Sequence, residues 1–296
     1  MITFEVSDNL TEEWLDHCRQ YFPRLLQERA LDSHKGSFGT VGIIGSCRGM
    51  SGAIVLAGTA ALFTGCGKLY LGFCQDQLPV PYIFDRAELM LDTANNLLDK
   101  KDITHWAVGC GMGQSRAAYD VLLNLLQHET QKPLLIDADA LNILSQHPEL
   151  IDHLAARLIP AILTPHPSEA ARLLGYSTEE IQANREEAAL ELSEKYFSRI
   201  VLKGHQSVIA APDEELVINQ SGNPGLATAG SGDVLSGMIV SLLAQGLPAD
   251  EAVAGGVWLH GAAADLLTLN QIGPIGLCSG EIAEAARFLR NLLVAA

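Results

Sequence analysis

The feature that most constrains the fold of this chain is a repeated alternation of short apolar runs with helical segments. The apolar runs predict buried strands at 41–45, 68–73, 106–109, 134–137, 161–164 and 200–203. Strands that alternate with helices form right-handed βαβ units, so the sheet is expected to be mostly parallel and covered on both faces. Two further runs, 207–211 and 215–219, lie close together and predict a hairpin.

Helical patterns fill the spaces between these strands and most of the last third of the chain. They are predicted at 53–64, 115–127, 178–197, 232–245, 249–267 and 280–293. Residues 1–32 form a polar, partly helical N-terminal lead-in that Pro23 interrupts. Because no linker, repeat or low-complexity tract is evident, residues 1–296 are expected to form a single α/β domain. Ligands of such sheets bind at the carboxyl ends of the strands, where functional residues are therefore expected.

The charge balance narrows the possible partners. The chain of 296 residues has a formal net charge of -16, which argues against binding to nucleic acid or to anionic membrane surfaces. It leaves a phosphate ligand possible, because backbone N–H groups can hold an anion whatever the overall charge.

The cysteines and the hydropathy pattern indicate an ordinary cytoplasmic protein. The six cysteines form no C-x-x-C pair and no zinc-like spacing with histidine, which favours reduced thiols. The first residues lack the basic start and apolar region of a signal peptide. No run approaches the roughly 20 apolar residues of a membrane span, so no membrane partner is expected.

The strongest functional signal is a glycine-rich segment, 223–233, that leads directly into a predicted helix. Glycines let backbone N–H groups approach a ligand, and the positive end of the following helix attracts a phosphate. Asp233 would lie in the first turn of that helix, where a carboxylate can take a proton from a hydroxyl that attacks phosphorus. The plainer interpretation is that Asp233 only caps the helix.

This segment resembles the N-x-G-x-A-x-x-G-x-G-D signature of the ribokinase-like superfamily, in particular its ADP/ATP-dependent NAD(P)H-hydrate dehydratase branch. The resemblance implies a three-layer α/β/α fold, an anion hole formed by Gly230, Ser231 and Gly232, and Asp233 as the catalytic base. Ala229 stands where many relatives have another glycine.

A second motif is Thr164-Pro-His-Pro-Ser-Glu169, which resembles the family's T-P-H-P-G-E motif with Ser168 in place of glycine. The resemblance implies that His166 contacts the substrate. It also implies that Glu169 helps to hold Mg²⁺, through water, which suits an ion that keeps several waters beside phosphates. Taken alone, a histidine between prolines would be a surface-loop residue.

A third motif, Lys203-Gly204-His205-Gln206-Ser207, lies between two predicted strands and resembles the K-G-x-x-[ST] element that lines the adenine nucleotide in this family. The family pattern adds Gly232 to the same nucleotide site. Without the resemblance, the segment would be a hairpin that exposes a lysine.

Two small residues are implied to face the substrate. Ala53 follows the loop after the first predicted strand, and Gly113 ends the loop after the strand at 106–109. Either position would otherwise be an ordinary turn or helix start. The first loop lacks Rossmann spacing, and Gly67-Lys68 is followed by Leu69, so a Walker A loop is absent.

Four polar residues complete the family pattern. Asp137 ends a predicted strand and would face the cleft, whereas Asp139 is equally well explained as the cap of the next helix. His260 and Asp265 lie in a helix rich in small residues and are interpreted mainly as packing residues near the nucleotide pocket.

The resemblance covers about residues 33–290 and leaves no room for the epimerase domain fused to some relatives. It implies ADP-dependent repair of hydrated NADH or NADPH, releasing AMP and phosphate, with ATP as the other possible donor and a tetramer as the expected assembly. The choice between NADH and NADPH hydrate stays open. Two alternatives are a small-molecule kinase of the same superfamily, of the hydroxyethylthiazole or pyridoxal kinase type, and an inactive nucleotide sensor.

Overall fold

A computed structural model describes residues 3–296 and contains one nine-stranded sheet of order β3-β2-β1-β4-β5-β6-β7-β8-β9. Strands β1 to β7 pair in parallel, and β8 and β9 add an antiparallel hairpin at one edge. The mostly parallel sheet and the hairpin are confirmed. The strands are β1 (Thr40–Gly45), β2 (Lys68–Phe73), β3 (Met90–Thr93), β4 (His105–Val108), β5 (Leu134–Ile136), β6 (Ile162–Leu163), β7 (Arg199–Leu202), β8 (Val208–Ala210) and β9 (Val217–Ile218).

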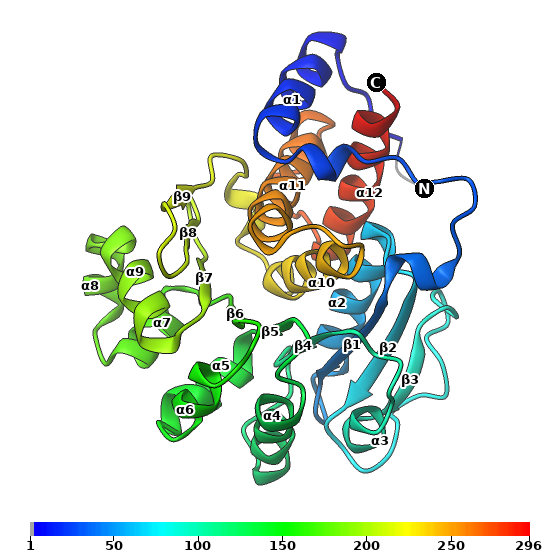
Figure 1. Cartoon of the computed structure of the whole chain (residues 1–296). Coiled ribbons are helices and arrows are strands. Elements are labelled where there is room, and N and C mark those ends of the chain that lie inside the picture. The colour runs from blue at the N-terminus through cyan, green and yellow to red at the C-terminus, as the bar shows by residue number, and fades with distance from the viewer. Residues whose placement is uncertain (1–2) are drawn as a thin grey trace.

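Helices cover both faces of this sheet, which confirms the three-layer α/β/α architecture. One layer contains α1 (Asp8–Tyr21), α2 (Ser51–Thr64), α10 (Ser231–Ala244), α11 (Ala249–Leu269) and α12 (Ser279–Ala295). The other contains α3 (Ala94–Leu98), α4 (Arg116–His128), α5 (Ala138–Gln146), α6 (Leu150–Ala155), α7 (Pro167–Leu174), α8 (Thr178–Ala183) and α9 (Arg185–Tyr196) (Figure 1). Short 3₁₀ helices are η1 (Pro23–Leu26), η2 (Lys35–Phe38) and η3 (Pro224–Leu226).

The central strands are apolar along their whole length because both of their faces are buried. In β1, Ile43 belongs to the core beneath α2 and α10, whereas Ile44 belongs to the core beneath α4 and α5. In β4, Ala107 faces the first of these cores and Trp106 the second. Alternate residues thus face opposite layers, which explains why these strands appear in the sequence as continuous apolar runs.

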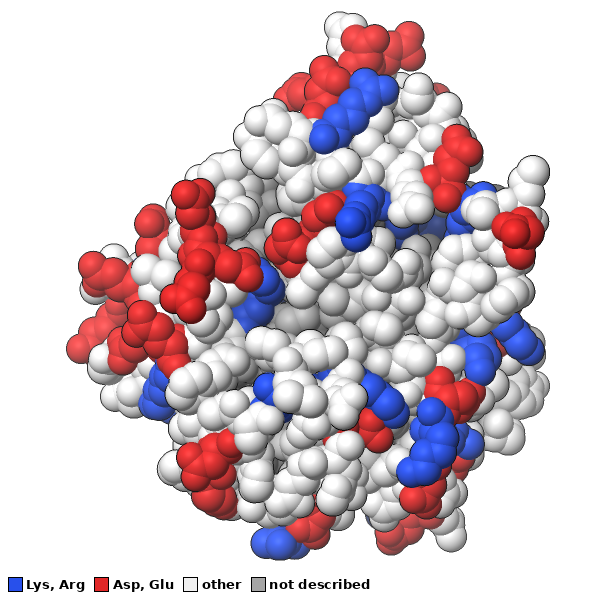
Figure 2. Space-filling model, in the orientation of Figure 1, with Lys and Arg blue, Asp and Glu red and all other residues white. Residues whose placement is uncertain are grey.

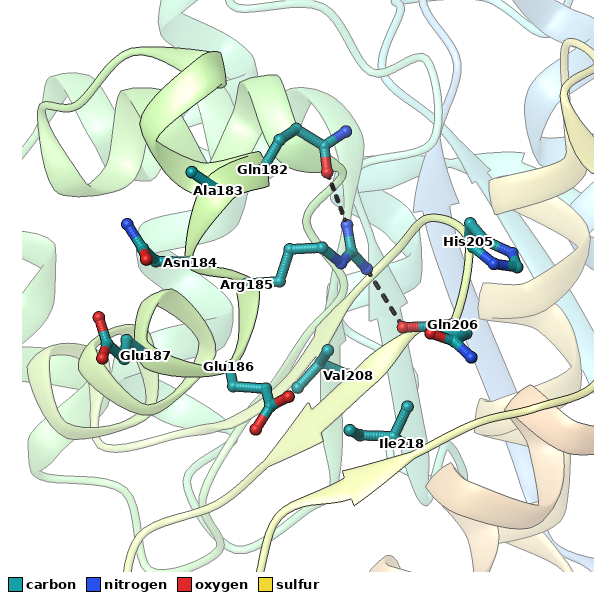
Figure 3. Close-up of a pocket in the computed structure, with 10 residues that line it drawn as sticks. All are labelled: Gln182, Ala183, Asn184, Arg185, Glu186, Glu187, His205, Gln206, Val208 and Ile218. Carbon is teal, nitrogen blue, oxygen red and sulfur yellow. Dashed lines mark hydrogen bonds between the residues drawn. The ribbon is translucent and has the colours of Figure 1, made fainter.

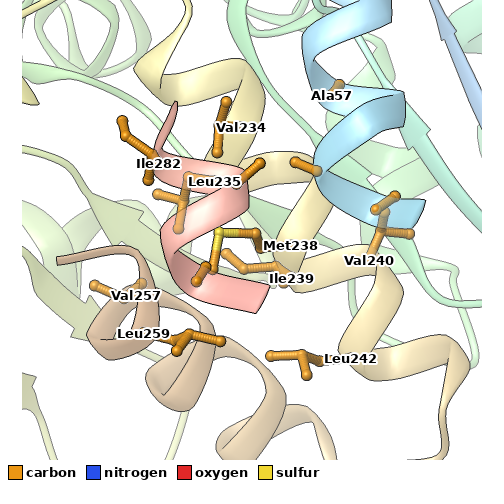
Figure 4. Close-up of a cluster of buried hydrophobic side chains, with 14 of the residues drawn as sticks. Ala57, Val234, Leu235, Met238, Ile239, Val240, Leu242, Val257, Leu259 and Ile282 are labelled. Carbon is orange, nitrogen blue, oxygen red and sulfur yellow. The ribbon is translucent and has the colours of Figure 1, made fainter. Parts of the chain in front are cut away.

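Helix α10 is the central helix of its layer. All its residues from Val234 to Ala244 are buried, so this stretch of the helix has no side that faces solvent. A Cβ on Gly237 would lie 2.0 Å from the carbonyl oxygen of Ala57, and one on Gly256 would lie 2.9 Å from Ile239. Figure 4 shows α10 side chains enclosed by neighbouring helices, with α2 and α12 residues among them. The position of α10 is therefore fixed by close packing on all sides.

Several elements differ from the sequence prediction, among them the short helices α6 and α7, which were not predicted. The segment 178–197 is two helices, α8 and α9, because the backbone of Asn184 leaves the helical region between them. The edge strand β3 and the short helix α3 were not predicted, since Met90–Thr93 is only partly buried and lacks an apolar run. The lead-in matches its prediction, with α1 ending before Pro23.

Helix α11 corrects the expectation about apolar runs. Its 21 residues are long and apolar enough to cross a membrane by length and composition alone. In the structure, 78% of its most apolar window is buried inside the fold, and α11 packs against α10 and α12.

Candidate active site

The glycine segment forms the start of α10, as predicted. Gly230 is the N-cap residue with φ of 86°, a left-handed conformation, and a Cβ there would lie 2.4 Å from Leu56. Both the backbone angle and the space therefore require glycine. Gly232 and Asp233 are partly exposed, so the N–H groups of the first turn can be reached from solvent.

Asp233 occupies the third position of α10, and its carboxyl group lies near the thiol of Cys110. Burial raises the pKa of Asp233 to about 6, and the negative charge of Asp137 adds to this effect, whereas the thiol and Lys203 oppose it. Burial and the same carboxylates raise the pKa of Cys110 well above its ordinary value. Cys110 therefore remains a protonated donor, and Asp233 is a weak base that is ionised at neutral pH.

Behind this carboxylate lies a buried polar network that joins β5, β7 and α10. Lys203 Nζ lies 2.7 Å from Asp137 Oδ1, and Ser236 Oγ donates to Asp137 Oδ2 at 2.7 Å. Glu169 Oε2 lies 4.0 Å from the same ammonium group. Burial lowers the pKa of Lys203, but Asp137 and Glu169 more than compensate and raise it above its ordinary value. Lys203 is thus a permanent cation at the end of β7.

The same ammonium group borders the start of α10. A Cβ on Gly232 would lie 3.1 Å from Lys203 Nζ and 3.8 Å from Asp137 Oδ2. The backbone N–H groups of the first turn, the positive end of a helix and a lysine therefore converge beside Asp233. This combination suits an anion such as a phosphate, with a base next to it.

Asp137 differs from its prediction in one respect, because it does not open onto a cleft. It is buried at 1% exposure, and its Oδ1 also accepts from the N–H of Ala138, so it is the N-cap residue of α5. Asp139, which the sequence leaves as a candidate cap, instead accepts from the N–H of Gly113 at 2.9 Å. Asp137 thus has the capping role, and Asp139 orients the loop that contains Gly113.

His166 and Glu169 form the capping box at the start of α7. His166 Nδ1 accepts from the N–H groups of Ser168 and Glu169, while its Nε2 lies 3.2 Å from Glu169 Oε1. Glu169 Oε2 accepts from the His166 N–H at 2.8 Å. Burial lowers the pKa of His166 to about 4 and raises the pKa of Glu169. His166 is therefore neutral, with both ring nitrogens engaged and an imidazole side chain that is 45% exposed.

The Lys203–Ser207 loop is a tight turn between β7 and β8. Gly204 has φ of 144° and Gln206 has φ of 55°, so two of its residues are left-handed. Ser207 Oγ donates to the Gly204 carbonyl oxygen at 3.2 Å. Gly204, His205 and Gln206 are exposed, which leaves the loop accessible to a ligand.

The two small residues implied for the substrate lie on neighbouring loops. A Cβ on Gly111 would lie 3.1 Å from Ala53 Cβ, and one on Gly113 would lie 3.1 Å from Cys47 Sγ. The loops after β1 and β4 therefore touch, and Cys110 joins them to Asp233. The predicted site residues lie on the loops that follow the carboxyl ends of β1, β4, β6 and β7 and at the start of α10.

Sequence reasoning missed Ser236 and interpreted His260 and Asp265 as packing residues, although all three support this site with hydrogen bonds. Ser236 carried one available signal, because a serine three positions after Asp233 interrupts an otherwise apolar helix. His260 was interpreted as packing, but its Nε2 lies 3.0 Å from the Ser231 carbonyl oxygen, and burial lowers the pKa of His260 to about 4. Asp265 accepts from the Gly222 N–H at 2.8 Å. Helix α11 thus supports the glycine segment with hydrogen bonds as well as packing.

The residues of this site do not form a direct metal cage. Residues 3–296 contain no group of three or more histidine, cysteine or acidic side chains placed to hold a metal ion. Both carboxylate oxygens of Glu169 are already engaged by His166. The site fits Mg²⁺ only as an ion held mainly by nucleotide phosphates and reaching Glu169 through water.

The sheet, its two helical layers and the buried helix that begins at a glycine-rich turn are the features of the ribokinase-like class of α/β proteins. A ribokinase-like superfamily protein from Enterococcus faecalis superposes with a TM-score of 0.76 at 29% identity, covering 91% of this chain and 94% of that one. Residues 41–285 match the NAD(P)H-hydrate dehydratase family, and the chain belongs to that family.

Two relatives support this assignment. An ADP-dependent (S)-NAD(P)H-hydrate dehydratase from Neisseria meningitidis serogroup B is 53% identical over 270 residues, which cover 91% of each chain. The crystal structure of an ADP/ATP-dependent NAD(P)H-hydrate dehydratase from Bacillus subtilis, co-crystallised with ATP and Mg²⁺, superposes with a TM-score of 0.78. It is 32% identical and covers 94% of this chain and 97% of that one.

Proposed function

We propose that this chain is an ADP-dependent (S)-NAD(P)H-hydrate dehydratase. In this reaction the hydroxyl oxygen of the hydrated nicotinamide ring bonds to the β-phosphorus of ADP, the bridging P–O bond breaks, and AMP leaves. The lone pair of the ring nitrogen then expels phosphate as the C–O bond breaks, and the neighbouring ring carbon loses a proton. The products are NADH or NADPH, AMP and phosphate. Phosphorylation is needed because hydroxide is a poor leaving group.

The observation that carries the proposal is the placement of Asp233 beside an anion site. Its carboxylate, with a pKa of about 6, lies one residue after Gly232, which borders the Lys203 ammonium group. We assign to Asp233 the removal of the hydroxyl proton, and to the N–H groups of Gly230, Ser231 and Gly232 the binding of the transferring phosphoryl group. Bound Mg²⁺ would supply charge neutralisation for the phosphates, with Glu169 as its water-mediated contact.

The remaining site residues divide into two binding regions. The adenine nucleotide is assigned to the Lys203–Ser207 loop and Gly232, because that loop is accessible and begins beside the proposed anion site. The hydrated ring is assigned to Ala53, Gly113 and the exposed imidazole of His166, which lie on neighbouring strand-end loops. Between these two regions, the ring hydroxyl would lie next to Asp233.

One coupled assay separates this function from its rivals. Chemically hydrated NADH is incubated with the protein, ADP and Mg²⁺, and NADH absorbance is followed while AMP and phosphate are quantified. Recovery of NADH with equal amounts of AMP and phosphate supports the dehydratase. A stable phosphate ester without NADH recovery would indicate a small-molecule kinase, and nucleotide binding without turnover would indicate a sensor. ATP in place of ADP tests the donor.

The role of Asp233 is tested with Asp233→Asn, which keeps the shape and removes the base. Turnover is expected to fall by about 10²-fold or more, while ADP binding is retained. Asp120→Asn is the matched control, because Asp120 pairs only with exposed Arg116 on α4. Near-normal turnover by Asp233→Asn would contradict the assignment.

A tetrameric assembly and a cytoplasmic location complete the proposal. The tetramer is tested by sedimentation velocity of the purified chain, and the location by fractionation of the native cells. The assay above, run with hydrated NADPH in parallel, determines which cofactor is preferred.

A further inference from the structure

We propose that Arg185 is the positioning residue that fixes the shape of the Lys203–Ser207 loop for the adenine nucleotide. The inference rests on the proposed function, because it takes this loop to line the nucleotide site. Arg185 is the first residue of α9 and lies 18 residues before Lys203 in the sequence.

The guanidinium group of Arg185 bonds to the backbone on both sides of the turn. Its Nη2 donates to the carbonyl oxygen of Leu202, the last residue of β7, at 3.0 Å. The same nitrogen donates to the carbonyl oxygen of Gln206 at 3.4 Å. Its Nη1 donates to the carbonyl oxygen of Lys203 at 3.4 Å. A single rigid group therefore sets the separation between the start and the end of the loop.

The loop conformation requires such support. Gln206 has φ of 55°, a left-handed conformation that a residue with a side chain adopts only when its surroundings hold it there. Gly204, with φ of 144°, lies so close to Arg185 that a Cβ would be 2.7 Å from Nη1. Arg185 thus contacts the loop at both of its unusual backbone positions.

The position of Arg185 in its own helix points the same way. A cation in the first turn of a helix is unfavourable, and the next two residues, Glu186 and Glu187, are acidic as local preference dictates. Arg185 violates this preference, and burial lowers the pKa of its guanidinium group. Because a partly buried arginine is unfavourable in the first turn of a helix, its presence there is explained by a tertiary role. Here that role is its hydrogen bonds to the carbonyl oxygens of the loop.

The surface around Arg185 strengthens this reading. Figure 2 shows acidic side chains gathered over the part of the molecule that contains α8 and α9, and the exposed Glu179, Glu180, Glu186 and Glu187 belong to these helices. These acidic groups face solvent, whereas the guanidinium group is directed at the loop carbonyls. The one cation at this helix start therefore serves the loop rather than a surface ion pair.

A cavity beside Arg185 makes the inference testable by chemical rescue. Its volume is about 570 Å³, and its lining includes Asn184, Arg185, Gln206 and Ile218. Figure 3 shows the guanidinium group between Gln182 and Gln206, at the wall of this cavity. If the side chain is shortened to alanine, a free guanidinium ion can enter from the cavity and occupy the vacated position.

The experiment uses the full chain with ADP, Mg²⁺ and hydrated NADH. For Arg185→Ala, the KM and Kd for ADP are expected to rise by about 10-fold or more, the loss typical of charge-assisted hydrogen bonds. The KM for hydrated NADH and the kcat at saturating ADP should stay within about twofold. Millimolar guanidinium chloride should lower the KM for ADP again, whereas urea, which has a similar shape and no charge, should not.

Two further variants complete the design. Arg185→Lys retains the charge but not the planar fork, so its KM for ADP should fall between those of the wild type and Arg185→Ala. It also decides the matter if Arg185→Ala does not fold, as judged by circular dichroism. Arg199→Gln is the matched control, because Arg199 lies at the opposite end of β7 and pairs with Glu214. It should behave as the wild type.

The outcomes separate this inference from the proposed function. A wild-type protein that neither binds ADP nor restores NADH overturns the proposed function. An active wild type whose Arg185 variants keep a normal KM for ADP overturns the role of Arg185 alone. Equal rescue by urea and guanidinium, or equal losses in kcat and in both KM values, also overturns it, because either result indicates a general structural defect.

Discussion

Replacing Asp233 with asparagine should stabilise the folded protein while it removes activity. Burial raises the pKa of this carboxyl group from 3.8 to about 6, which is a difference of roughly two on the pH scale. Each unit corresponds to about 1.4 kcal/mol, so the ionised carboxylate costs at most about 3 kcal/mol of folding free energy. The position of the carboxylate near a helix N-terminus stabilises its charge by about 0.3–1 kcal/mol. Partial exposure screens the cost further, which leaves a net gain of about 1–2 kcal/mol for Asp233→Asn.

The gain should depend on pH in a specific way. The folded-state pKa lies above the unfolded value, so protonation favours the folded form and the cost is absent below about pH 3.8. The cost grows as pH rises from 3.8 to 6 and is fully present above 6. Asp233→Asn should therefore be more stable than the wild type at pH 8, and the difference should shrink at pH 4.5.

Denaturant unfolding of the wild type, Asp233→Asn and the Asp120→Asn control at both pH values measures these differences. A stabilisation of 1–2 kcal/mol should also raise the Tm by a few degrees for a chain of this length. The reasoning fails if Asp233→Asn is no more stable than the wild type at pH 8. It also fails if the gain is the same at pH 4.5.

Four further predictions concern the polar network around Asp233 and the packing of α10. The kcat/KM of the wild type should rise about tenfold per pH unit up to about pH 6, because Asp233 must be ionised to act as a base. A flat profile of kcat/KM between pH 4.5 and 7 would exclude that role. Lys203→Met leaves Asp137 buried and unpaired, so denaturant unfolding should show a loss of about 3–5 kcal/mol, and an unchanged stability would contradict the ion pair. Ser236→Ala removes one hydrogen bond to Asp137 and should lower the free energy of unfolding by about 1–3 kcal/mol in the same measurement. An unchanged free energy of unfolding would show that this hydrogen bond does not stabilise the fold. Gly237→Ala inserts a methyl group against the backbone of α2 and should lower the Tm by several degrees, whereas a tolerated substitution would show that α10 can shift.

The strands of the sheet were predictable because burial on both faces leaves a simple signal. β2 was predicted with its exact bounds of 68–73, and the other central strands to within one or two residues. β3 lies at the edge, where Met90 is exposed and Asp92 is tolerated, so no apolar run marked it. The break at Asn184 was missed because a single asparagine, although a weak helix former, is tolerated inside a helix, and only its backbone conformation reveals the boundary.

The site was predictable where one continuous motif supplies both the backbone and the side chain. Gly230 to Asp233 lie together in the sequence and in the structure. Ser236 and its partner Asp137 are 99 positions apart, so their hydrogen bond exists only once β5 and α10 are packed together. Arg185 is similar, because its partners are carbonyl oxygens, which no residue pattern can indicate. Supporting contacts of this kind depend on the tertiary fold and not on local sequence.

The enclosure of α10 has a consequence for turnover. A helix packed between α2, α11 and the sheet cannot slide or tilt without repacking the hydrophobic core on its side of the sheet, so the proposed base is stationary during the reaction. Any opening that admits cofactor or lets AMP escape must then come from the periphery. At the proposed nucleotide side, the outer strand β9 of the β8–β9 hairpin exposes both Val217 and Ile218, so it is less restrained by packing than the buried helix α10.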